Sequence, residues 1–351
     1  MKTKPITKFA ILALSLVLVA CAGGGSEEAG CPAIDGREIN VVATTPMIGE
    51  FVSQVGGENI NLTVLMPPEA NPHTYEPAPQ DAGTIAEADL VFYTGLLYEP
   101  AALVKLLENS ACSTDILSEV GESVFPIEFK EGGHDDHDDH DDHDDEEGHD
   151  DHDDEEGHDD HDDEEGHDDH EGHNHGAYDP HFWFDPSRVA YAAEYIESRL
   201  IQFDPENESS YISSADSFVS ELNDLTKQVS ELISTVPSQN RKLITTHESL
   251  GYLEAKFGLE VLSTIIPSLN SANEISPSDL AGVIDVIEDN NVKVIFIESE
   301  APSVYSETIV AETGIKPVTG LYVETLKPGQ SYSEFLISNV KLITENLQDT
   351  D

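Results

Sequence analysis

Three of the fifteen histidines in this 351-residue sequence lie in separate motifs whose residues could bind a ligand. His73 lies in NPHTYEP, His181 in DPHFWFDP beside the only tryptophan, and His247 in THESLGY. A lone histidine is more often an ordinary surface or core residue than a ligand. However, His73 and His247 follow apparent strands, and strand-end loops are where α/β sheets present ligand-binding groups. We therefore treat the three motifs as candidate parts of a binding site.

The other twelve histidines belong to an acidic repeat with a period of nine residues. Residues 131–175 contain 26 acidic residues and no lysine or arginine, in a chain of net charge −55. Such a charge balance favours cations and argues against nucleic acid or anionic lipid as a partner. Because the repeat has no apolar side chain to bury and repels itself, we predict a disordered loop over residues 131–176. Its histidines are His134, His137, His140, His143, His149, His152, His158, His161, His167, His170, His173 and His175.

Two regions of alternating strand and helix patterns must position the three isolated histidines. Strands are expected at residues 39–44, 62–66, 90–94, 242–246, 260–266 and 292–298, and helices at 48–55, 82–88, 250–257 and 277–288. This alternation predicts parallel sheets with covering helices. Between the regions, residues 188–203 are amphipathic, and residues 208–236 form an uninterrupted helical pattern. We predict an α/β fold with two lobes, each with a mainly parallel sheet, joined by one long linker helix.

The N-terminus resembles a bacterial lipoprotein signal. Lys2, Lys4 and Lys8 precede an apolar run over residues 9–20, which ends in Leu-Val-Ala before Cys21. A helix of that length spans roughly 18 Å, which is too short for a bilayer core of about 30 Å. We therefore expect a signal peptide over residues 1–20 and lipidation of Cys21, although an ordinary signal peptide beside a chance cysteine would look similar.

Two cysteines remain once Cys21 carries lipid. In an oxidising compartment, one disulfide between Cys31 and Cys112 is the simplest arrangement, and two buried free thiols are the alternative. The expected divisions of the mature chain are a lipidated tether over residues 21–37, an N-terminal lobe over 38–206 that contains the acidic loop, a linker helix over 207–237, and a C-terminal lobe over 238–351.

The motifs NPHTYEP, DPHFWFDP and THESLGYLEAKFGLEV resemble, in this order, the three histidine motifs of zinc and manganese solute-binding proteins of ABC transporters. The resemblance covers nearly the whole chain after the tether and includes an acidic histidine-rich insertion. It implies two lobes with a metal held between them, and it implies His73, His181 and His247 as ligands. For the fourth ligand, Glu324 stands where the family often has aspartate, and Glu298 and Glu300 are competing candidates.

This ligand set favours Zn²⁺ over Mn²⁺. Three imidazoles with one carboxylate or water suit a tetrahedral zinc ion, whereas manganese prefers more oxygen ligands. A zinc hydrolase with an open coordination position is an alternative, with Glu248 beside His247 as its base, but the sequence has no HExxH motif and no nucleophile motif. A zinc-buffering or adhesive surface lipoprotein, and a manganese or iron homologue, are further alternatives.

The resemblance also implies partners and a location. We expect a monomer that is anchored by lipid outside the cytoplasm, in the periplasm or at the cell surface, and that delivers zinc to the permease of an ABC importer. The acidic repeat ends at His175, which is at most about 20 Å from His181 along the chain. Its twelve imidazoles would therefore raise the zinc concentration near the site, although a passive acidic loop is the alternative.

Overall fold

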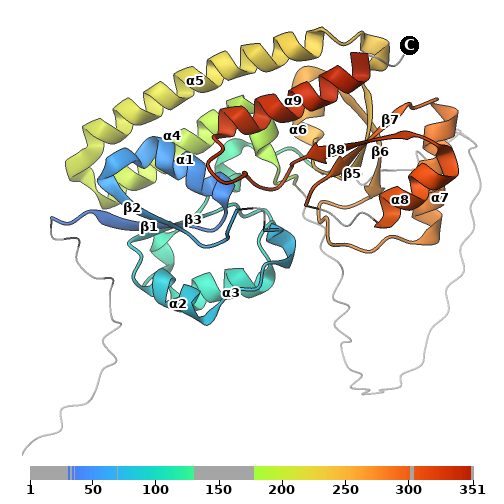
Figure 1. Ribbon diagram of the computed structural model, residues 1–351. Coiled ribbons are helices and arrows are strands. Elements are labelled where there is room, and N and C mark those ends of the chain that lie inside the picture. Colours follow the sequence, from blue (N-terminus) through green and yellow to red (C-terminus); the bar gives the residue numbers. More distant parts are fainter. Residues whose placement is uncertain are drawn as a thin grey trace, which may run out of the picture.

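The computed structural model describes residues 31, 34, 36–68, 70–129, 178–300 and 304–348. The expected signal peptide, Cys21 and the acidic repeat with its twelve histidines lie outside these residues. Two sheet-containing lobes stand side by side beneath two long helices (Figure 1). No helix among the described residues is both long enough and apolar enough to cross a membrane.

A four-stranded parallel sheet forms the first lobe, in the order β2-β1-β3-β4. Neighbouring residues of its central strands enter different apolar clusters: Val41 packs beneath α1, whereas Val42 packs towards α2 and α3. This alternation follows from the two-residue period of a strand. Its elements are β1 Ile39–Ala43, α1 Pro46–Gly56, β2 Ile60–Val64, α2 Pro79–Ala86, β3 Leu90–Tyr93, α3 Ala101–Ser110, β4 Leu117–Glu119 and α4 Pro186–Phe203.

The second lobe has two pairs of parallel strands, β5-β6 and β7-β8, with β5 beside β7. One face packs isoleucines and valines against α7 and α8, while Leu243 and Phe296 on the other face join the cluster beneath α9. Its elements are β5 Lys242–His247, α6 Gly251–Phe257, β6 Glu260–Ile266, α7 Pro277–Asp289, β7 Val294–Glu298, α8 Val304–Thr313, β8 Lys316–Leu321 and α9 Tyr332–Gln348.

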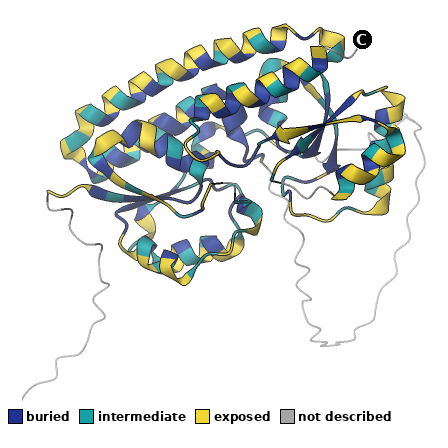
Figure 2. Ribbon diagram, viewed as in Figure 1, coloured by how far each residue is buried: buried dark blue, intermediate teal, exposed yellow. Residues whose placement is uncertain are grey.

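Helix α5, Glu208–Ser234, is the long element that the sequence predicts between the lobes. Its 27 residues span about 40 Å. It packs on α1 and α4 of the first lobe and on α6 and α9 of the second (Figure 1). Its buried side chains recur at three- and four-residue spacings, and its other side faces solvent (Figure 2). One apolar cluster therefore continues from lobe to lobe beneath this helix.

Element boundaries differ from the expected ones where local pairing or capping decides them. Strand β2 begins at Ile60, earlier than residue 62, because it pairs in register with β1 from Ile39. Helix α7 is capped by Ser276, whose side chain accepts from Asp279 N while the Asp279 carboxylate accepts from Ser276 N. Helices α3, α8 and α9 and strands β4 and β8 are not among the elements expected from the sequence. In α8 the apolar residues do not form one stripe, so periodicity gives no signal there.

Candidate metal centre

His73 lies in a short 3-10 turn, Pro72–Thr74, at the edge of the first lobe. Asn71 shapes this turn, because its Oδ1 accepts a hydrogen bond of 2.9 Å from His73 N. The Asn71 amide also reaches the second lobe, where its Nδ2 donates to Ser271 Oγ at 3.0 Å and to the carbonyl oxygen of Glu300 at 3.2 Å. The same asparagine therefore orients the His73 loop and links it to the opposite lobe.

His181 is fixed by the aromatic residues that follow it and by Asp179. Phe182, Trp183 and Phe184 are fully buried and form a 3-10 turn before α4. Asp179 Oδ1 accepts from both the backbone N and the ring Nδ1 of His181, each at 2.8 Å. A histidine that donates through Nδ1 has Nε2 as its free lone pair, so Asp179 selects the tautomer that can bind a cation.

His247 is the last residue of β5, and Glu298 is the last residue of the neighbouring strand β7. Glu298 Oε2 lies 2.5 Å from His247 Nδ1, and its Oε1 accepts from His247 N at 3.1 Å. Glu298 was a competing candidate for the fourth ligand. In the structure it contacts the far side of the imidazole and orients it, as Asp179 does for His181.

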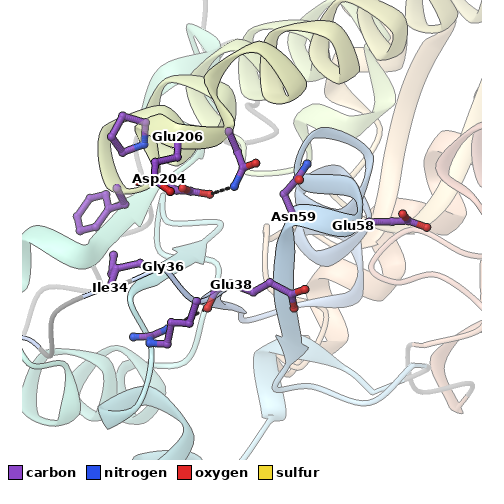
Figure 3. Close-up of a pocket in the computed structure, with 11 residues that line it drawn as sticks. Ile34, Gly36, Glu38, Glu58, Asn59, Asp204 and Glu206 are labelled. Atoms are coloured by element: carbon purple, nitrogen blue, oxygen red, sulfur yellow. Dashed lines mark hydrogen bonds between the residues drawn. The ribbon is translucent and has the colours of Figure 1, made fainter.

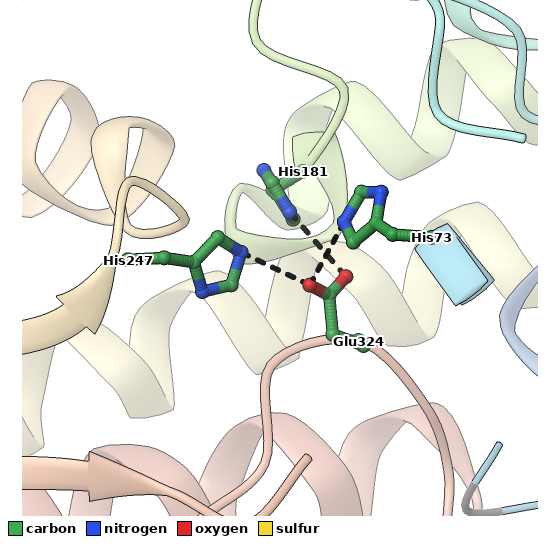
Figure 4. A group of neighbouring side chains, drawn as sticks. All are labelled: His73, His181, His247 and Glu324. Carbon is green, nitrogen blue, oxygen red and sulfur yellow. Dashed lines mark hydrogen bonds and ion pairs between the residues drawn. The ribbon is translucent and has the colours of Figure 1, made fainter. Parts of the chain in front are cut away.

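Glu324 lies in the loop after β8 and completes a group of four side chains (Figure 4). Its Oε1 is 3.1 Å from His73 Nε2 and 2.9 Å from His247 Nε2, and its Oε2 is 3.4 Å from His181 Nε2. One ligand atom from each side chain lies within 4.8 Å of the others. Among the described residues this is the only such group of histidine, cysteine, aspartate or glutamate side chains.

Burial makes the unpaired atoms of this group costly. The side chains of His181, His247 and Glu324 are fully buried, and that of His73 is 3% exposed. The Nε2 atoms of His181 and His247 approach Glu324 without hydrogen-bond geometry and have no hydrogen-bond partner in the described part of the chain. Because a buried unpaired polar atom costs about 1–3 kcal/mol, these atoms are suited to a cation that would use both lone pairs.

Electrostatic interactions within the group shift the pKa values of its members, so the binding of a cation is coupled to the release of protons. Burial lowers the pKa of His181, but the Asp179 hydrogen bond and the Glu324 carboxylate outweigh it and raise the pKa to about 9. Burial likewise opposes protonation of His247, but the charges of Glu298 and Glu324 raise its pKa well above the usual value. Burial raises the pKa of Glu324, but His73 and His247 outweigh it and hold that pKa well below its usual range.

The remaining candidate acids lie outside the group. Glu300 Oε1 accepts from the backbone N atoms of Val323 and Glu324, so it supports the loop that carries Glu324. Burial and the nearby charges of Glu324 and Glu298 raise the pKa of Glu300 to about 8. Glu248, the possible base of a hydrolase, instead accepts a 2.9 Å hydrogen bond from Thr264 Oγ1.

Sequence reasoning did not single out Tyr98, which the structure places in contact with Glu324 and His73. Its hydroxyl donates to Glu324 Oε2 at 2.9 Å, and its ring is 5.1 Å from that of His73. The sequence contains eleven tyrosines, and no motif in the segment GLLYEP marks its tyrosine as part of a metal site. Only the packing of two distant segments identifies this residue.

Two other features lie apart from the group formed by His73, His181, His247 and Glu324. Cys31 and Cys112 are joined by a disulfide, which ties the N-terminal segment to the end of α3. A pocket of about 340 Å³ near the start of β1 is polar (Figure 3). There, Asp204 accepts from Tyr211 and Asn207, and Arg37 pairs with Asp89, so these charged groups already have protein partners.

Comparison with known proteins assigns the chain to a protein family. The sequence profile of the family described as "Zinc-uptake complex component A periplasmic" matches residues 41–346. The chain belongs to this family. Its members are solute-binding components of metal transporters and not enzymes, so the protein is the metal-binding component of an ABC import system.

Two relatives of similar length are named as lipoproteins associated with manganese. The manganese-binding lipoprotein MntA of Halalkalibacterium halodurans is 22% identical, over 95% of this chain and 94% of its own. The manganese ABC transporter substrate-binding lipoprotein PsaA of Streptococcus anginosus is 25% identical, over 98% of this chain and 99% of its own. As the segment before Cys21 predicts, the protein is an extracytoplasmic lipoprotein anchored to the membrane.

Solved structures confirm the expected α/β fold with two lobes. The periplasmic zinc-binding protein TroA from Treponema pallidum superposes with a TM-score of 0.70 at 20% identity, over 88% of this chain and 99% of that one. The Fe(III)-bound YtgA from Chlamydia trachomatis has a TM-score of 0.69 at 24% identity, over 88% and 98% of the two chains. One of these proteins is named for zinc and the other is bound to Fe(III), so the fold alone does not determine which ion this chain binds.

Proposed function

We propose that this protein captures Zn²⁺ between its lobes through Nε2 of His73, His181 and His247 and one carboxylate oxygen of Glu324. The observation that carries the proposal is the convergence of these four buried side chains within 4.8 Å. Three nitrogens and one oxygen form the donor set of a tetrahedral zinc site. The metal is the cargo of the protein, and the protein then delivers it to the permease of its importer.

The spacing of the donor atoms supports zinc. Zn–N bonds of about 2.0–2.1 Å place tetrahedral ligand atoms about 3.3 Å apart. Glu324 Oε1 lies 3.1 Å from His73 Nε2 and 2.9 Å from His247 Nε2, a little below that value, and His181 Nε2 lies 3.4 Å from the other oxygen, Oε2. Manganese is the second candidate, because MntA and PsaA are named for manganese, but this ion prefers a site richer in oxygen.

The distribution of the ligands also suits a carrier that must release its cargo. His73 and His181 come from the first lobe, expected over residues 38–206, and His247 and Glu324 come from the second, expected over residues 238–351. If the lobes moved apart, the site would lose half of its ligands. Docking on the permease would therefore act through the linker helix and through the contacts that Asn71 makes between the lobes.

A competition titration tests the proposal. Purified mature protein, stripped of metal, should bind one Zn²⁺ tightly and should prefer it to Mn²⁺ when both are titrated against a chromophoric chelator. Replacement of His73, His181 and His247 together by Ala should remove the tight site, because too few ligands remain to bind the ion. Glu324→Gln should weaken zinc binding, and Glu248→Gln is its control, since Glu248 is a half-buried carboxylate that bonds to Thr264. Tight zinc binding by the triple variant would refute the assignment, and a preference for Mn²⁺ would favour the second candidate.

A further inference from the structure

The loop between β3 and α3 has a strained backbone beside the metal centre. Gly95, Leu96 and Leu97 have φ angles of 76°, 53° and 62°, which place three consecutive residues in the left-handed region. Leucine rarely adopts this conformation, because its Cβ approaches the following carbonyl oxygen. Such a conformation persists only where surrounding groups hold it.

Two glutamates hold this loop. Glu99 accepts hydrogen bonds from Thr94 N at 2.7 Å and from Gly95 N at 2.9 Å, and Glu119 accepts from Leu96 N at 2.8 Å. The loop passes so close to Glu119 that a Cβ on Gly95 would lie 2.0 Å from Glu119 Oε1. The carboxylates of Glu99 and Glu119 thus accept hydrogen bonds from backbone N–H groups that would otherwise lack partners. Because these bonds hold the loop, Tyr98, which follows Leu97, has a fixed position.

The fixed position of Tyr98 brings its hydroxyl across the lobe boundary to Glu324. The side chain is buried, with its ring centroid 5.1 Å from that of His73 and 5.3 Å from that of Trp183. Its hydroxyl lies 2.9 Å from Glu324 Oε2 and 3.1 Å from the Glu324 carbonyl oxygen. A phenol donates a strong hydrogen bond to a carboxylate, so Tyr98 reduces the capacity of Oε2 to bind a cation.

We propose that Tyr98 is a positioning residue that makes Glu324 a one-oxygen ligand and thereby sets the selectivity of the site for zinc over manganese. This inference rests on the proposed function of the site. Oε1 is the oxygen near two imidazoles, at 3.1 Å from His73 Nε2 and 2.9 Å from His247 Nε2. Oε2 lies farther from its imidazole, at 3.4 Å from His181 Nε2, and accepts the hydrogen bond from Tyr98. With Oε2 engaged, the site offers three nitrogens and one oxygen; with Oε2 free, Glu324 could chelate and offer the additional oxygen that manganese favours.

Tyr98→Phe tests this inference, because it removes the hydroxyl and keeps the ring. The zinc-to-manganese affinity ratio should fall about tenfold or more, the change expected for losing a hydrogen bond to a charged group. Co²⁺ bound at the site gives a second readout. The unaltered protein should show the intense visible bands of four-coordinate Co²⁺, and Tyr98→Phe should show the weaker bands of a higher coordination number.

Tyr211→Phe is the matched control. Tyr211 is also fully buried, and its hydroxyl donates to the Asp204 carboxylate at 2.6 Å, outside the metal centre. Its loss should leave the affinity ratio and the Co²⁺ spectrum unchanged. Tyr98→Leu, which also lacks the hydroxyl, should shift both readouts in the same direction as Tyr98→Phe.

The outcomes separate this inference from the proposed function. If folded Tyr98→Phe and Tyr98→Leu keep the original affinity ratio and Co²⁺ spectrum, Tyr98 does not set selectivity, although the zinc site stands. If the unaltered protein prefers Mn²⁺ or holds Co²⁺ with six ligands, the proposed zinc function itself fails, whatever the variants do.

Discussion

Three of the four proposed ligands have a neighbour that fixes which of their atoms faces the metal. Asp179 contacts Nδ1 of His181, Glu298 contacts Nδ1 of His247, and Tyr98 contacts Oε2 of Glu324. These contacts direct the two histidine Nε2 atoms and Glu324 Oε1 towards one point. The same contacts determine how the metal-free site responds to pH.

At the residue scale we predict that zinc affinity rises with pH up to about pH 9. In the metal-free protein the pKa of His181 is raised to about 9, so this imidazole carries a proton at neutral pH and must release it when zinc binds. The affinity should therefore fall from pH 9 to pH 5, and zinc binding at pH 7.5 should release protons. Calorimetry in buffers of different ionisation enthalpy measures that release; a flat affinity with no proton release would contradict a three-histidine site.

A disulfide remote from the metal centre contributes to the stability of the first lobe. The Cys31–Cys112 disulfide joins the segment before β1 to the end of α3, across a sequence separation of 81 residues. Closing so long a loop in the unfolded chain restricts its conformational freedom, which favours the folded state. Cys112 also packs against the apolar cluster on the α2 and α3 side of the sheet, and not against the histidines.

At the element scale we predict that Cys112→Ser lowers the free energy of unfolding by about 2–4 kcal/mol and leaves zinc affinity unchanged. Urea unfolding of the metal-free protein, followed by circular dichroism, measures the change. Reduction of the original protein should shift its midpoint similarly, whereas reduction of the variant should have no effect. Two free thiols in protein isolated from its own compartment would contradict the disulfide.

At the scale of the whole molecule, the acidic repeat and the metal centre are separate parts of the chain. Glu128 and Tyr178, on either side of residues 130–177, pair in an antiparallel bridge, so the two ends of this long segment lie together. The four side chains of the centre all lie outside it. A short loop could therefore replace the repeat without moving His181.

We predict that deletion of residues 133–175 leaves the fold and the tight zinc site intact and removes several weaker zinc equivalents. Calorimetry should show a lower stoichiometry with the tightest dissociation constant nearly unchanged. In cells, uptake should suffer mainly when zinc is scarce, because we expect the repeat to raise the local concentration of the ion. Loss of the tight site on deletion would mean that the repeat, and not the lobes, supplies its ligands.

The sequence alone determines much of this protein. Alternating strand and helix patterns predict the parallel strands of both lobes, and an uninterrupted apolar stripe predicts α5, because both periods arise within one element. The three histidines were identifiable because each lies in a distinctive local motif. Elements without such a signal, such as α8, were not identifiable, since tertiary packing and not local pattern stabilises them.

Only the tertiary structure decides among the three candidate carboxylates. Glu298 ends β7, Glu300 follows it and Glu324 follows β8, so all three lie near strand ends of the second lobe. The family resemblance favours Glu324, but no local pattern excludes the other two. Because β5 lies beside β7, Glu298 reaches the far side of His247, while the loop after β8 brings Glu324 to all three imidazoles. Tyr98 reaches Glu324 from 226 residues away in the chain. Contacts of this kind are set by how the lobes pack together, and no local pattern encodes them.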